Sequence, residues 1–168
     1  MKTNYFIVFI ALIFTSCFYN NDDNFIPTAT GPSASLFEPT TMLRSELETS
    51  ITLQEAKPII ETGKIYVKGQ YLFINEPYTG FHIINNADPA NPIVEKFLVT
   101  PGATDLIFKN DSFYINQAVD LVALKFNAAF DGIVETQRVE NIFPQLLSPD
   151  GFYPNIAPNE IVINWTQN

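Results

Sequence analysis

The chain has 168 residues, of which 46% are hydrophobic and 14% aromatic, so it can form one domain with a packed core. Its formal net charge of −9 excludes a basic surface able to neutralise nucleic-acid phosphates or to dock on anionic lipid by charge. We therefore expect no nucleic-acid partner.

The first segment has the pattern of a secretory signal peptide. Lys2 gives a positively charged start, and residues 5–14 carry no charge and are mostly apolar. A membrane-spanning helix needs about 20 apolar residues, whereas the apolar region of a signal peptide needs only about 7–15. We therefore predict a signal peptide at residues 1–16.

Cys17, the only cysteine, follows the small residues Thr15 and Ser16. This arrangement resembles the lipobox of bacterial lipoproteins, although Phe14 stands where leucine is commonest. The resemblance implies lipid attachment at Cys17, which would anchor the chain to a membrane of the bacterial cell envelope. A core thiol or a metal ligand is the alternative, but there is no second cysteine and the only histidine, His82, is distant in sequence.

Polar and small residues dominate the segment after the cysteine, so we predict a flexible tether at residues 17–40 and a folded domain at 41–168. The pair Asp22–Asp23 resembles a signal that sends some lipoproteins to the outer leaflet of the outer membrane. A solvated linker explains the pair equally well. We expect an outer membrane lipoprotein, with its surface exposure left open.

The domain contains an internal repeat. Residues 65–75 align with 106–116 at a spacing of 41, and this alignment places Ile74 on Ile115. After one deletion, residues 81–84 align with 121–124, and 93–95 with 133–135, at a spacing of 40. Residues 152–165 would form a degraded third copy.

Each copy has the pattern of four short strands joined by turns, which is the size of a propeller blade. We therefore predict a mostly β fold with two propeller-blade-like antiparallel sheet units plus a partial third. A short helix is expected within Met42–Ser50, with Ser45 as its N-cap and Glu48 completing a capping box.

The phrases Gly63–Gly69, Gly80–Asn85 and Asp120–Leu124 resemble those of LVIVD-repeat proteins, which are bacterial envelope lipoproteins with propeller-like repeats. The resemblance covers roughly residues 42–145, and it departs from the signature at Ala123 and Lys125. It implies architecture and location rather than activity. Propellers close with about four to eight blades, so two units cannot close into a ring by themselves. Three arrangements remain open: a sandwich-like pair of sheets, exposed edges covered by the proline-rich tail, or association of copies.

Catalytic candidates are few. His82 should lie on a strand opposite Phe81 and Ile83, and we expect it to be half-exposed and structural. The acids at predicted strand ends or turns are typical turn residues, and a pair of them could alternatively serve a hydrolase acting on an envelope or glycan substrate: Glu76, Asp88, Asp105, Asp111, Asp120 and Asp131. The segment Asn85–Asp88 is oxygen-rich but lacks the ligand pattern of an EF-hand, so we expect no metal and no cofactor.

Most aromatic residues of the repeats should be buried, because alternation along a strand buries one face. Tyr78, in a predicted turn, is the exception, and it is our ligand-binding candidate, although the favoured alternative is a turn residue that folds back on its own sheet. The sequence favours a non-enzymatic binding or interaction module with a protein or glycan partner. The hydrolase and a purely structural envelope protein are the alternatives.

Overall fold

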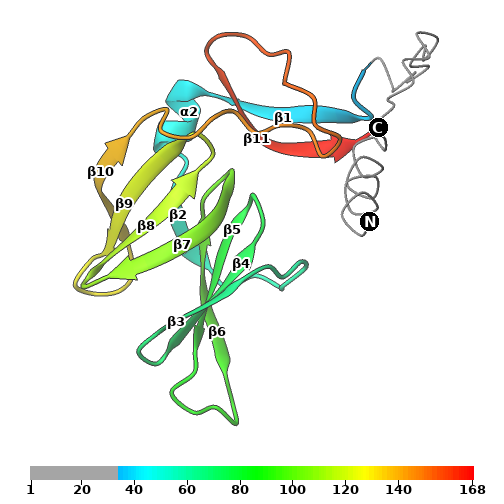
Figure 1. Cartoon of the computed structure of the whole chain (residues 1–168). Helices are drawn as coiled ribbons and strands as arrows, with labels where there is room; N and C mark the ends of the chain where they lie inside the picture. Colours follow the sequence, from blue (N-terminus) through cyan, green and yellow to red (C-terminus); the bar gives the residue numbers. More distant parts are fainter. Residues whose placement is uncertain (1–33) are drawn as a thin grey trace, which may run out of the picture. The chain divides into compact units, whose positions relative to one another are not determined.

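The computed structural model describes residues 34–168 (Figure 1). The predicted signal peptide, Cys17 and residues 18–33 lie outside these described residues. Strand β1 spans Phe37–Leu43. The last residues of the predicted tether therefore belong to the folded domain, and the predicted boundary at residue 40 is too late.

Two four-stranded antiparallel meanders confirm the predicted mostly β fold and its two sheet units (Figure 1). Sheet 1 is formed by β3 (Ile65–Lys68), β4 (Tyr71–Glu76), β5 (Gly80–Asn85) and β6 (Ile93–Val99). Sheet 2 is formed by β7 (Ala103–Lys109), β8 (Ser112–Gln117), β9 (Asp120–Phe126) and β10 (Ile133–Val139). Strand β2 (Thr52–Glu55) adds to sheet 1 beside β6.

The register of the strands confirms the repeat in the first hairpin of each sheet. Ile74 pairs with Ile65, and the predicted equivalent Ile115 pairs with Leu106. Both hairpin turns contain a left-handed residue at the same place, Gly69 with φ 59° and Asn110 with φ 54°. Glycine and asparagine are the residues that tolerate this conformation in short hairpin turns.

The alignment predicted for the last strand of each unit is wrong by one residue. Ile83 pairs with Lys96, and its equivalent Ala123 pairs with Gln137, so β10 matches β6 at a spacing of 41 rather than 40. The connection between β9 and β10 restores the residue that the preceding turn lacks. Both pairs carry a bulge at the corresponding position, which supports the match.

The third sheet is not a third copy of the same unit. Strand β11 (Glu160–Gln167) contains the second half of the predicted copy, but its partner is β1. Residues 152–155 form no strand, so this half of the prediction is wrong. The C-terminal strand therefore closes onto the beginning of the folded domain.

The predicted short helix is present as α2 (Arg44–Thr49), but it begins one residue before Ser45. Leu43 is the N-cap, and its backbone N–H donates to Oε2 of Glu46. Leu47 is fully buried and packs in a small cluster with Val119 of the β8–β9 turn. This helix is too short to cross a membrane, and residues 34–168 contain no helix that could.

The main core lies between sheets 1 and 2, and every strand of both meanders except β3 and β10 contributes to it; the side chains of those two strands only flank it. The core residues are Phe73, Phe81, Ile83, Leu98, Ala103, Leu106, Phe113, Ile115, Val122 and Leu124. Ile115 is 1% exposed, whereas the equivalent Ile74 is only half-buried. The two equivalent residues therefore differ in burial. Stacked sheets present opposite sides to the layer between them, so equivalent residues do not share one core.

Candidate functional site

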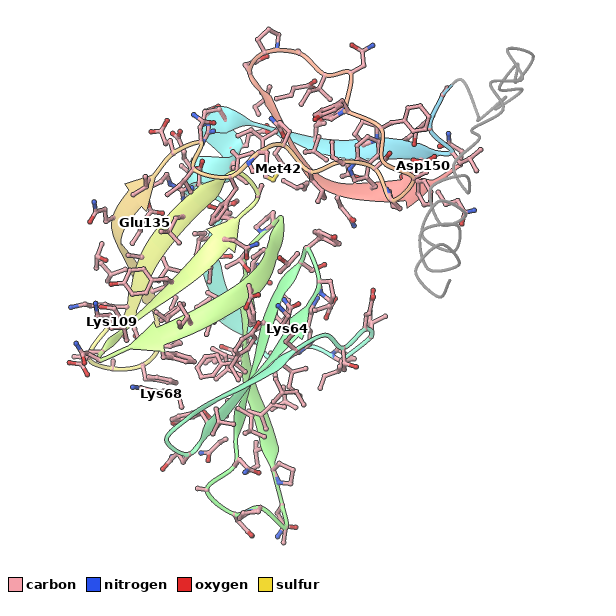
Figure 2. The ribbon with its side chains drawn as sticks, viewed as in Figure 1. Met42, Lys64, Lys68, Lys109, Glu135 and Asp150 are labelled. Carbon is pink, nitrogen blue, oxygen red and sulfur yellow. The ribbon has the colours of Figure 1, made fainter. Side chains whose placement is uncertain are left out.

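An aromatic pocket lies where the hairpin ends of sheets 1 and 2 meet. Its volume is about 240 Å³, and we call it the aromatic pocket, defined by Lys68, Tyr71, Phe73, Phe108, Asn110, Asp111, Phe113, Phe126 and Phe130. Figure 2 labels Lys68 and Lys109, which mark the two hairpin ends. The ammonium group of Lys68 donates to the backbone oxygen of Asn110 at 2.9 Å, so the two hairpins are in contact at the rim.

Ring contacts between the two sheets form the wall of the pocket. Tyr71 of sheet 1 stacks on Phe130, with ring centroids 4.8 Å apart, and Phe130 stacks on Phe126 at 4.2 Å. Phe73 of sheet 1 meets Phe108 of sheet 2 at 4.8 Å in a tilted arrangement. Offset and tilted ring pairs each stabilise by about 0.5–1.5 kcal/mol beyond area burial.

Phe130 is held in the pocket wall by a strained turn. Its φ of 59° is left-handed, a conformation that costs a bulky side chain about 1–3 kcal/mol. Asn127 supports this turn, because its Oδ1 accepts from the backbone N–H groups of Asp131 and Gly132. The backbone N–H of Phe130 donates to the backbone carbonyl oxygen of Asn127. The turn and its two stacking contacts therefore place the ring between Tyr71 and Phe126.

The rim of the pocket is polar. Lys68 lies 5.9 Å from the centroid of the Phe108 ring and supplies a cation, while the exposed Asp111 supplies a carboxylate. Outside the pocket lining, Asp105 of sheet 2 bonds both Lys64 and the hydroxyl group of Tyr66. Partial burial, together with the bond and the negative charge of Asp105, raises the pKa of Tyr66 to about 12. Tyr66 is therefore a hydrogen-bond donor at any physiological pH.

His82 is fully buried, which contradicts the expectation of a half-exposed histidine. As predicted, it lies opposite Phe81 and Ile83, which belong to the main core. Its Nε2 is 2.7 Å from Oε2 of Glu76, and its Nδ1 has no hydrogen-bond partner within residues 34–168. Burial by itself raises the pKa of Glu76, but hydrogen bonds from Lys57 and His82 outweigh that effect and lower it. His82 is thus closed to solvent, and the side chain of Glu76 is 10% exposed.

A second buried charge cluster joins helix α2 to sheet 2. The side chain of Asp120 is fully buried and accepts hydrogen bonds from Arg44 at 2.6 Å and from Arg138 at 2.8 Å. Burial opposes ionisation, yet the bonds from Arg44, the backbone of Asn141 and Arg138 lower the pKa of Asp120. Asp120 is therefore held by partners within the fold, and its side chain is not exposed to solvent.

The other predicted acids are spread over separate turns. Asp88 accepts from the backbone of Ala90 and from Asn91 within its own turn, and these two bonds lower its pKa. Asp131 bonds Asn127. Of the acids singled out, only Asp111 lines the aromatic pocket. The described part of the chain contains no group of three or more His, Cys, Asp or Glu side chains placed to hold a metal.

Tyr78 is not among the residues that line the aromatic pocket. It has a left-handed φ of 60° and a half-buried side chain, and its backbone bonds Ala103 and Gly102. Its role in ligand binding stays a prediction. Sequence reasoning missed Phe126 and Phe130, for which the available signal was the Asn127–Gly132 turn.

In comparisons with protein-family models, curated proteins and solved structures, none matches this chain. The resemblance to LVIVD-repeat proteins therefore stays a prediction from sequence.

Proposed function

We propose that this chain is a lipid-anchored interaction module of the bacterial cell envelope, and that the aromatic pocket binds one apolar side chain of a protein partner. The observation that carries the proposal is the wall of stacked rings in the pocket, with a polar rim on an otherwise apolar lining. Such a combination of apolar surface and a few oriented polar groups is typical of binding sites.

The size of the pocket favours a side chain over a whole small molecule. Ligand pockets usually have about 300–1,000 Å³, while an apolar cavity of about 150 Å³ is large enough to bind benzene. A volume of about 240 Å³ therefore suits a Phe, Trp or Leu side chain. Single buried anchors of this kind dominate the binding energy of many protein interfaces.

Preorganisation supports the same proposal. The strained backbone at Phe130 and its support by Asn127 hold the ring in place before any partner arrives. A binding site that is already ordered avoids the entropy cost of about 0.5–1.5 kcal/mol for each side chain that would otherwise be immobilised.

The proposed location depends on the sequence rather than on the described residues. The lipobox-like segment ending at Cys17 would anchor the chain, and the polar residues after it would allow the domain to reach a partner. An anchored domain gains effective concentration toward partners in the same membrane, so a pocket of modest affinity is sufficient.

Nuclear magnetic resonance titration with side-chain analogues tests the pocket. N-acetyl-phenylalaninamide and N-acetyl-leucinamide should shift the ring signals of Phe108 and Phe130 saturably, and N-acetylglucosamine should not. Phe130→Ala should weaken binding by about tenfold, equivalent to about 1.4 kcal/mol. Phe143→Ala is the matched control, because Phe143 is 38% exposed and does not line the pocket.

Equal weakening by Phe130→Ala and Phe143→Ala, with both variants folded, would refute the pocket. Saturable shifts with N-acetylglucosamine alone would indicate that the pocket binds a glycan and not a protein side chain.

A further inference from the structure

A second groove lies between the two-stranded ribbon β1–β11 and the loop at residues 140–159 that leads into β11 (Figure 1). Its volume is about 400 Å³, and it shares no residue with the aromatic pocket. Sites that hold whole small molecules usually measure about 300–1,000 Å³, so this groove is large enough for one. We call it the ribbon groove, defined by the lining residues Phe37, Glu38, Phe152, Tyr153, Asn155 and Trp165.

Strand pairing and the loop together place the rings of the ribbon groove. Pro39 pairs with Trp165, and alternation along β1 puts Phe37 on the same side of the ribbon as Pro39. The indole Nε1 of Trp165 donates to the backbone oxygen of Leu146 at 3.2 Å, which joins this side of the ribbon to the loop. Phe37 and Trp165 are half-buried, whereas Tyr153 is 84% exposed. The groove is therefore lined by half-buried rings from the ribbon and by one exposed ring from the loop.

The rings of the ribbon groove differ from those of the aromatic pocket in their neighbours. The rings of the aromatic pocket stack on one another, but within residues 34–168 no ring of the ribbon groove pairs with another aromatic ring. Both contacts between a lysine and a ring face lie elsewhere in the described domain, at Phe97 and Phe108. The ring faces of the ribbon groove therefore have neither an aromatic nor a cationic neighbour from the described chain.

The ribbon and its loop carry negative charge only. Residues 34–43 and 140–168 contain no lysine, arginine or histidine. The acids of these two segments are Glu38, Glu140, Asp150 and Glu160. Among the residues that line the groove, Glu38 is the only charged one, and it is exposed. A surface whose charges all have one sign attracts ligands of the opposite charge, so this part of the molecule favours a cation.

We infer that the ribbon groove binds a small organic cation that carries a quaternary ammonium group. The face of an aromatic ring is negative and attracts a cation within about 6 Å of its centroid, and tryptophan does so most strongly. A quaternary ammonium group has no N–H, so it needs no hydrogen-bond acceptor, and its methyl groups make apolar contacts with the rings. A primary ammonium group has three N–H donors to satisfy, and a lining dominated by rings suits it less well.

Tryptophan fluorescence of the full chain in detergent micelles tests this inference, because Trp165 is the only tryptophan. Choline should change the emission saturably. Dimethylbutanol, the uncharged isostere in which carbon replaces the nitrogen, should bind at least about tenfold more weakly. Phosphocholine and glycine betaine carry the same cation beside an anion, so both should bind more weakly than choline. Isothermal titration calorimetry of choline binding gives a second readout that does not depend on the indole.

Substitutions at Tyr153 separate the ring from the rest of the side chain. Tyr153 is 84% exposed, so its variants should fold, as circular dichroism would verify. Tyr153→Leu should weaken choline binding by about fivefold, whereas Tyr153→Phe keeps the ring and should bind as wild type does. Phe143→Leu is the matched control, because Phe143 belongs to the same loop, is 38% exposed and does not line the groove.

Four results would overturn the inference. They are the absence of saturable choline binding by both methods, equal binding of dimethylbutanol, equal weakening by Tyr153→Leu and Phe143→Leu, and tighter binding of phosphocholine than of choline. The last result would indicate a lipid headgroup as the ligand. None of these results bears on the aromatic pocket, because the two sites have no residue in common.

Discussion

Asp120 shows how one buried carboxylate can hold separate segments of a chain together. It bonds Arg44 at the start of α2, Arg138 on β10 and the backbone of Asn141. Removing one partner of a buried ion pair leaves uncompensated charge, which typically costs about 3–5 kcal/mol. The cluster therefore fixes α2 against sheet 2, although burying it brings little net stability by itself.

Asp120→Asn should lower the free energy of unfolding by about 3 kcal/mol at pH 7, measured by urea denaturation. The pKa of Asp120 is lowered by folding, so its contribution is present above the ordinary carboxyl pKa and disappears as pH falls through the folded pKa. The difference between wild type and variant should therefore shrink toward about pH 2. Asp131→Asn, in an exposed turn, should change stability little. A difference that is independent of pH would contradict this account.

Cys17→Ala tests the proposed lipid anchor by removing one thiol group. Loss of the thiol removes the acceptor for acylation, so labelled palmitate should no longer enter the protein and the chain should leave the membrane fraction. We expect the thermal unfolding of the described domain, residues 34–168, to be unchanged. Incorporation of palmitate at the wild-type level would show that Cys17 is not the acylated residue.

At the scale of elements, the repeat was predictable because the turn residues and the alternation of apolar and polar residues along the strands both recur in the two units. Gly69 and Asn110 occupy the same left-handed place, and the pairing of Ile74 and Ile115 with their neighbouring strands is equivalent. Which side of each sheet becomes core was not predictable from one strand. That choice depends on which sheet lies next to it, and the two sheets have their neighbours on opposite sides.

This difference makes a prediction for matched substitutions. Ile115→Asp places a charge in the core between the sheets and should unfold the domain or cost more than about 4 kcal/mol. Ile74→Asp lies on the half-buried outer side and should cost clearly less. Urea denaturation of both variants measures the difference. Equal costs would mean that equivalent residues share equivalent surroundings, contrary to the stacking described above.

At the scale of the whole described domain, the mostly β class followed from local patterns, but the third sheet did not. Strand β1 lies in a segment that resembles a linker, and it is ordered by pairing with β11 more than a hundred residues later in the sequence. Strand propensity and hydrophobic periodicity depend only on residues that are close together in the sequence. They carry no information on such a pairing.

The aromatic pocket was unpredictable for a related reason. Its walls come from five strands and two connections, and the position of Phe130 depends on a strained turn supported by Asn127. The sequence identified aromatic residues of the repeats and assigned most of them to the core. It could not show that two sheets would meet unevenly at one end and leave a space there.

Photo-crosslinking in intact cells is the most direct test of the central claim, that the aromatic pocket is where the envelope partner binds. A photoreactive residue at the rim position Lys68 should give a discrete adduct whose mass is not a multiple of the chain's own. That adduct should disappear when Phe130→Ala is added. The same residue at Tyr153, 84% exposed and outside the pocket, should give none. Equal adducts from both positions, or an adduct that persists with Phe130→Ala, would contradict the claim.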